Sequence, residues 1–138
     1  MTPNEDAQKR YLALQHLEQK IQQLQQHLAL LNQQRAELLL MIQHLDDLER
    51  VKLDSKSFVT LGAGIYLSSE VKDTKHVLVN VGAGVLVLKT PGEAKAMLQK
   101  QVADVQSIQQ QAENELQKMV LEGRTLQSEL QGLVSSQS

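Results

Sequence analysis

The stretch LGAGIYLSSEVKDTKHVLVNVGAGVLVL (residues 61–88) contains the tripeptide Gly-Ala-Gly twice, twenty residues apart. Each copy separates two short runs rich in the β-branched and aromatic residues that favour strands. The four expected strands are residues 58–61, 65–71, 76–81 and 85–89. The remaining connection, Lys72–Lys75, contains Asp73 and also has the composition of a turn. The segment is therefore predicted to form a small sheet of four strands joined by three turns.

The two Gly-Ala-Gly copies are interpreted as hairpin turns, because glycine adopts the positive φ angles that tight turns require. The turn glycines are Gly62, Gly64, Gly82 and Gly84. A phosphate-binding loop fits less well, since the third glycine of G-x-G-x-x-G is replaced by Leu67 in one copy and Val87 in the other. Neither copy is followed by a helical pattern.

Heptad repeats flank this segment on both sides, with apolar residues at alternating spacings of three and four. The positions in the first flank are Leu14, Leu17, Ile21, Leu24, Leu28, Leu31, Arg35, Leu38, Ile42 and Leu45. Those in the second are Leu98, Val102, Val105, Gln109, Ala112, Leu116, Met119, Gly123, Leu126, Leu130 and Leu133. Two long helices in an antiparallel coiled coil are predicted, with local splaying where Gln109 and Gly123 interrupt the seam. The fold class is α+β, with two β-hairpins inserted between the helices.

Both helices have the same start signal, in which threonine at the N-cap precedes proline and glutamate follows at the third helical position. The signals are Thr2-Pro3-Asn4-Glu5 and Thr90-Pro91-Gly92-Glu93. The first helix is expected to continue to Leu53, where Asp54-Ser55-Lys56-Ser57 breaks it. The expected parts are an N-terminal helix at 1–53, two hairpins at 54–90, and a C-terminal helix and tail at 91–138.

The composition excludes several function classes. The chain has 138 residues, a net charge of −2, 2% aromatic residues and no cysteine. This balance gives no basic surface for nucleic acid, and no thiol for a metal site or a disulfide. The longest aliphatic run, Leu38–Ile42, is far shorter than a membrane span. We expect a soluble, cytoplasmic protein.

No catalytic or cofactor site is expected. His16, His27 and His44 are too far apart along one helix to share a metal ion, and His76 stands alone in the strand region. No nucleophile lies in a pattern with a base. We therefore expect neither an enzyme nor a metal or cofactor protein.

The last two strands are apolar on both faces, whereas a strand with one face in water alternates apolar and polar residues. So small a sheet cannot cover both of its own faces. We expect the helices to cover one face and another subunit to cover the other, which makes the chain an obligate oligomer. The residues expected to join subunits are Val59, Leu61, Ile65, Leu67, Val79, Val81, Val85 and Val87.

With these elements in place, the sequence resembles the α class of prefoldin subunits. The similarity is most specific in VTLGAG, in EVKDTKHVLVNVGAGVLVLK and in the helix that begins at the following Pro-Gly. It implies a hexamer of two α and four β subunits, joined through a double β-barrel platform that carries six coiled coils. The family's function would be that of a chaperone that works without ATP, holding unfolded polypeptides between the coiled-coil tips and passing them to a group II chaperonin.

The helix ends farthest from the sheet are therefore the expected client-binding tips. Their apolar residues are Tyr11, Leu12, Leu14, Leu17, Leu126, Leu130, Leu133 and Val134. Leu14, Leu17, Leu126 and Leu130 could equally close the seam, whereas Tyr11, Leu12 and Val134 lie off it. Two alternatives stay open from sequence. One is a coiled-coil scaffold or adaptor with a single dedicated partner, and the other is a prefoldin-like subunit of a different complex.

Overall fold

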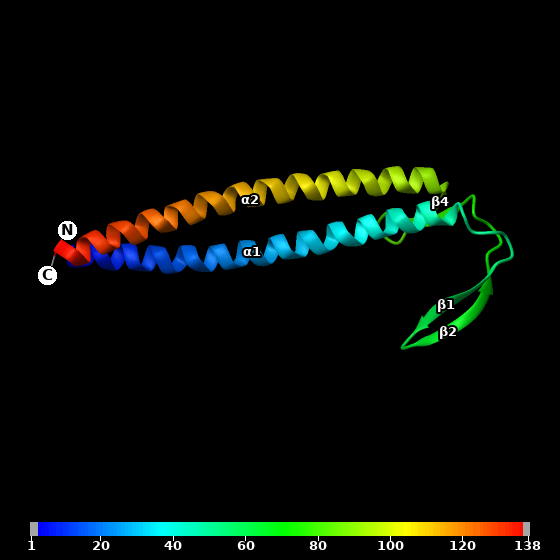
Figure 1. Cartoon of the computed structure of the whole chain (residues 1–138), viewed down its shortest axis with the longest axis horizontal. Coiled ribbons are helices and arrows are strands. Elements are labelled where there is room, and N and C mark those ends of the chain that lie inside the picture. The colour runs from blue at the N-terminus through cyan, green and yellow to red at the C-terminus, as the bar shows by residue number, and fades with distance from the viewer. Residues whose placement is uncertain (1–2, 137–138) are drawn as a thin grey trace. The chain divides into compact units, whose positions relative to one another are not determined.

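The computed structural model describes residues 3–136 and contains two long helices with two β-hairpins between them (Figure 1). The elements are α1 (Pro3–Leu48), β1 (Lys56–Gly62), β2 (Ile65–Glu70), β3 (Val77–Asn80), β4 (Leu86–Lys89) and α2 (Pro91–Ser136). The predicted α+β fold class and element order are confirmed. The chain divides into two compact units, one from residues up to Gln34 and from Val105 onward, the other spanning Arg35–Asp104.

In the first unit, the N-terminal part of α1 packs against the C-terminal part of α2. The pairing is antiparallel, because Arg10 contacts Glu129 while Asn32 contacts Gln109. The predicted seam positions are among the least exposed ones along both helices, with Leu17, Leu31 and Ala112 each no more than 8% exposed. Apolar burial along this seam holds the two helices together.

The two interruptions of the second seam are packed rather than splayed. Gln109 is only 7% exposed, and its Nε2 donates a hydrogen bond of 2.7 Å to Oδ1 of Asn32. A polar residue at one core position fixes the register of a coiled coil. At Gly123, a β-carbon would lie 3.5 Å from Cδ2 of Leu17, an ordinary contact distance. The predicted local splaying is therefore wrong at both positions.

In the second unit, the start of α2 packs against the end of α1. Ala94, Leu98 and Val102 are buried, and Nζ of Lys95 lies 2.8 Å from Oδ1 of Asp46 on α1. α2 begins at Pro91 as predicted. The amide of Glu93 donates to Oγ1 of Thr90 at 3.2 Å, which caps the first turn. The matching signal at Thr2 lies outside the described residues.

α1 ends at Leu48, five residues before the predicted end. The last amides tighten into i to i−3 bonds, from Glu49 to Asp46 and from Arg50 to Asp47. Asp54 then takes a positive φ of 66°. Asparagine and aspartate tolerate this left-handed conformation better than other side chains do. The helix thus ends before the expected break, which Asp54 begins, and the exposed Leu53 lies in the connection rather than in the helix.

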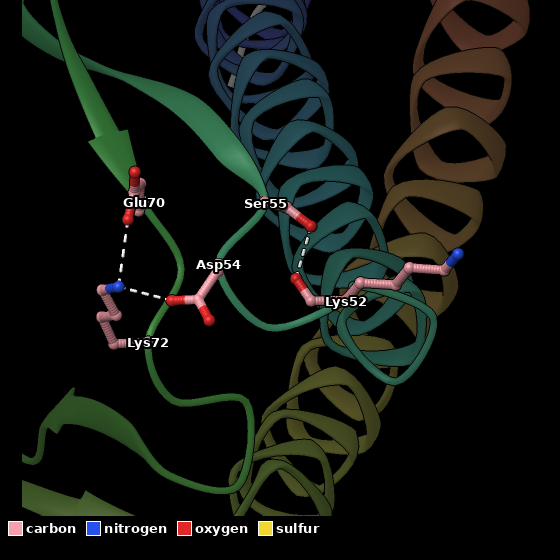
Figure 2. A network of polar contacts seen from close by, with 5 residues as sticks. All are labelled: Lys52, Asp54, Ser55, Glu70 and Lys72. Carbon is pink, nitrogen blue, oxygen red and sulfur yellow. Dashed lines mark hydrogen bonds and ion pairs between the residues drawn. The ribbon is translucent and has the colours of Figure 1, made fainter.

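A polar network joins this connection to the base of the first hairpin (Figure 2). Lys72 forms ion pairs with Asp54 and with Glu70, and the Ser55 hydroxyl donates to the carbonyl of Lys52. Two backbone bonds extend the strand pairing, from Asp54 to the carbonyl of Val71 and from Val71 to that of Ser55. The hairpin is thus fixed at its base by backbone bonds and by charge.

The four strands form two separate antiparallel sheets, β1–β2 and β3–β4. The Lys72–Lys75 connection therefore joins two sheets, and the prediction that it pairs adjacent strands of one sheet is wrong. Both Gly-Ala-Gly copies form the predicted turns. All six of their residues have positive φ, with Gly62 at 101° and Gly82 at 118°. In each turn the amide of the first glycine donates to a side chain two residues earlier. Gly62 donates to Oγ1 of Thr60, and Gly82 donates to Oδ1 of Asn80.

Candidate functional site

The tip, defined as residues 3–17 of α1 and 123–136 of α2, carries a shallow groove of about 450 Å³. Its lining comes from both helices: Asn4, Ala7, Gln8, Tyr11, Leu12, Leu130 and Val134. Tyr11, Leu12 and Val134 are each more than half exposed. The groove therefore offers water-exposed apolar side chains beside two amide side chains.

The predicted tip residues fall into two groups. Tyr11, Leu12, Leu130 and Val134 meet in the groove. Leu14, Leu17, Leu126 and Leu133 do not line it, and they are half-buried or, for Leu17, buried in the seam. The seam interpretation is therefore favoured for Leu14, Leu17 and Leu126, while half-buried Leu130 takes part in both.

An ion pair connects the two helices at the tip. Nε of Arg10 lies 2.8 Å from Oε2 of Glu129, and both side chains are partly exposed. The hydrogen bond from Arg10 to Glu129 raises the pKa of the arginine above its usual value, and the nearby charge of Asp6 acts in the same direction. Arg10 is therefore a permanent cation at the tip.

Sequence reasoning missed the polar part of this site: Asn4, Gln8, Arg10 and Glu129. A signal was present for Arg10. Continuing the heptad backward from Leu14 places Ala7 at an a position and Arg10 at a d position, and both are half-buried. The heptad pattern could thus have been extended by one repeat. The paired glutamate had no comparable signal, because it lies beside the seam.

The hairpin β1–β2 is a second candidate surface. Every residue of β1 is exposed, and Phe58 is 71% exposed. Val59 and Leu67 are cross-strand partners, and both are more than half exposed, as are Leu61 and Ile65. The helices were expected to cover one face of the sheet, and for this hairpin that expectation is wrong. Neither face is covered by other described residues of the chain, because β1–β2 forms a sheet of its own.

The hairpin β3–β4 has two unequal faces. Val77 and Val79 are half-buried, and they line a groove of about 550 Å³ together with helix residues such as Leu45, Leu48 and Met97. The opposite face carries Leu78, Leu86 and Leu88, each more than half exposed. Val79, which was predicted to join subunits, is half-buried and lines this groove, and its place in a subunit contact stays a prediction.

The remaining predicted residues of this hairpin, Val81, Val85 and Val87, are exposed, and the amide of Val81 bonds to the carbonyl of Val85. Sequence reasoning missed the exposed leucines of β3–β4, and also Phe58 and Tyr66. The prediction chose the residues of only one face of each hairpin. In the structure, both faces of β1–β2 are exposed, and so is the face of β3–β4 that carries Leu78, Leu86 and Leu88.

The connection between the hairpins is ordered by Asp73. Its carboxylate accepts a 2.7 Å bond from the amide of Lys75 and lies 3.1 Å from Nδ1 of His76. These contacts, the backbone bond first, lower the pKa of Asp73 below its usual value. At the neighbouring position, hydrogen bonds to Asp54 and then Glu70 raise the pKa of Lys72. Both groups are surface charges that fix the connection.

Within residues 3–136, no three histidine, cysteine or acidic side chains are placed to hold a metal ion. No helix in the same range is long and apolar enough to cross a membrane.

Comparison with known proteins gives a consistent result. The family described as prefoldin subunit matches residues 17–136. A prefoldin subunit alpha of Archaeoglobus fulgidus is 25% identical over 130 residues, which cover 94% of this chain and 95% of that protein. Another, from Methanococcus maripaludis, is 28% identical over 115 residues, covering 83% and 78%.

A solved structure has the same fold. It is described as the cryo-EM structure of filamentous PFD from Methanocaldococcus jannaschii, and it superposes with a TM-score of 0.77. The match covers 85% of this chain and 97% of that one, at 17% identity.

Proposed function

The chain belongs to the prefoldin family, a family of chaperones and not of enzymes, and from that premise we propose that it captures unfolded polypeptides at its tip without ATP and transfers them to a group II chaperonin. Assembly with other prefoldin subunits is supported by the family match. The proposed assembly contains two α and four β subunits, joined through the hairpins, in the cytoplasm.

The observation that carries the capture proposal is the exposed apolar groove at the tip. Tyr11, Leu12 and Val134 come from two helices and are each more than half exposed. Exposed apolar patches of this kind mark interaction sites. Unfolded chains differ from folded ones in the apolar side chains that they expose, so a shallow apolar groove recognises them without a defined sequence.

Several copies acting together would compensate for a weak individual contact. A groove of this size buries only a few side chains, so a single tip binds weakly. In an assembly, a client held by one tip meets the others at a high effective concentration. The exposed hairpins matter to function for this reason, because they are the surfaces available to bring tips together.

The experiment is suppression of aggregation of two unrelated denatured proteins by the purified assembly, without ATP. The variant Tyr11→Ser/Leu12→Ser/Val134→Ser is expected to lose most of the suppression, because it makes the groove polar. The control is Leu30→Ser/Leu121→Ser, which removes exposed leucines of the same unit that do not line the groove.

Equal activity of the two variants would contradict the site. A wild-type assembly that binds one dedicated partner and suppresses no aggregation would instead support the adaptor alternative. Chaperonin transfer is tested separately, by release of the captured client on adding a group II chaperonin with ATP.

A further inference from the structure

We propose that the Arg10–Glu129 ion pair is a salt-sensitive latch that holds the two helix ends of the tip together and sets how readily the tip opens. The latch would regulate the same site as the proposed function. Only its expected effect on client capture rests on that function.

Arg10 lies at a position that is normally apolar. It occupies a core d position of the extended heptad and is half-buried, whereas the flanking residues Lys9 and Tyr11 are exposed. Apolar residues at a and d hold a coiled coil together, and a charged residue there costs stability. At this layer of the tip, α1 therefore contributes a cation in place of an apolar side chain.

The tip beyond Leu14 has few apolar residues at the core positions of α1. Outward from that residue, the core positions of α1 are Arg10 and Ala7, a cation and a small side chain. α2 contributes Leu130 and Leu133, both half-buried. The core positions of α1 thus offer these two leucines little apolar surface, and the apolar side chains of Tyr11 and Leu12 beside Leu130 are themselves more than half exposed. The ion pair therefore contributes more to closing the outer tip than to closing the seam at Leu17, where apolar burial holds the helices together.

The Arg10–Glu129 ion pair is accessible to solvent. The side chains of Arg10 and Glu129 are 34% and 47% exposed, so dissolved ions reach the pair. Exposed ion pairs weaken as salt rises, because the screening length shortens from about 10 Å at 0.1 M to about 3 Å at 1 M. When the pair opens, Leu130 and Leu133 become more exposed beside Tyr11 and Val134. An opened tip therefore offers a larger apolar surface to an unfolded chain.

The test is hydrogen exchange of tip amides, read by mass spectrometry on the purified assembly at low salt and at about 1 M salt. High salt is expected to speed exchange at the tip of the wild type by about two- to five-fold, the range that loss of an exposed ion pair allows. Arg10→Leu restores an apolar core position, so its tip is expected to exchange more slowly than that of the wild type and without salt dependence.

Charge reversal provides the decisive comparison. Glu129→Arg is expected to speed tip exchange through repulsion from Arg10, and the double variant Arg10→Glu/Glu129→Arg is expected to return most of the way to the wild type. The matched control is Lys95→Gln, which removes an interhelical ion pair of the same 2.8 Å length from the other unit and should leave tip exchange unchanged. Circular dichroism of each variant establishes that the helices are retained.

Tip exchange that is indifferent to salt and to Arg10→Leu, or a double variant that exchanges as fast as Glu129→Arg alone, would overturn the latch. For clients, capture at low salt is expected to rise with Glu129→Arg and to fall with Arg10→Leu. If the wild type suppresses no aggregation at all, the proposed function fails, while the exchange result still decides whether the latch exists.

Discussion

Leu31 in the helical seam is 6% exposed, whereas Phe58 in the hairpin β1–β2 is 71% exposed. The apolar side chains of the helices are buried within the chain, because in each unit the heptad seams of the two helices pack together. The hairpin β1–β2 is not covered by other described residues, although it carries large apolar side chains such as Phe58, Ile65 and Leu67. An apolar surface is therefore buried only where the chain itself provides a surface to pack against it. The hairpin surface that stays exposed is available to another subunit.

The largest expected effect removes the apolar character of the open hairpin. Val59→Ser/Leu67→Ser changes one cross-strand pair that is exposed on the free chain. If a neighbouring subunit buries both side chains, the association should weaken by at least about 3 kcal/mol, or about 100-fold, measured by analytical ultracentrifugation. Helix melting of the free chain should not change. The control Leu30→Ser/Leu121→Ser should assemble normally, and an equal loss in both variants would break the comparison.

The next effect tests the covered seam. Leu31→Ala removes a buried side chain and is expected to lower the free energy of unfolding by about 2–3 kcal/mol, because a cavity or a collapsed layer remains. Leu30→Ala changes the adjacent leucine, which is 59% exposed, and should cost less than about 0.5 kcal/mol. Thermal and urea melts followed by circular dichroism measure both. Similar losses would mean that the seam runs along a different face of α1.

A smaller effect is expected at the turns. Gly82→Ala places a β-carbon at φ 118°, where L-residues are strained, and should destabilise the hairpin β3–β4 by about 1–2 kcal/mol. Ala83→Gly, at φ 51°, relieves a left-handed alanine and should cause no loss. Hydrogen exchange of the amides of β3 and β4 reports the difference. Faster exchange in Ala83→Gly than in Gly82→Ala would contradict the turn geometry.

The smallest effect sharpens the account of the seam. Gly123→Ala should stabilise the chain by about 0.5–1 kcal/mol, since alanine is the better helix former. The new methyl group would also meet Leu17 at an ordinary contact distance. Gly132→Ala, where a β-carbon meets nothing, isolates the helix-propensity effect. Destabilisation by Gly123→Ala alone would mean that the helices approach more closely there.

Much of the fold could be predicted from the spacing of apolar residues and from local start and turn signals. The heptads fixed the seam, Thr90-Pro91 fixed the start of α2, and the glycines of both tripeptides fixed the turns. The end of α1 was missed because the residues after Leu48, including Val51 and Leu53, are still apolar. The separation into two sheets was missed because alternation describes faces and not which strands pair.

The candidate site was predicted only in its apolar half. Tyr11, Leu12 and Val134 could be recognised as apolar residues off the seam, and they are exposed in the groove. Arg10 and Glu129 come from opposite ends of the sequence, so their pairing depends on how the two helices are aligned along their length. The heptad pattern does not determine this alignment, because shifting one helix by a whole heptad gives the same pattern. Asn4 and Gln8 are polar residues on a polar helix and carry no distinguishing pattern.

The central claim is that the open hairpins join this chain to other prefoldin subunits. Native mass spectrometry of the tagged chain, purified gently from its own cells, tests it most directly. The account predicts two copies of this chain with four copies of a smaller subunit of the same family, and loss of that species in Val59→Ser/Leu67→Ser. A monomer, or a simple homodimer that is unaffected by the hairpin variant, would contradict it.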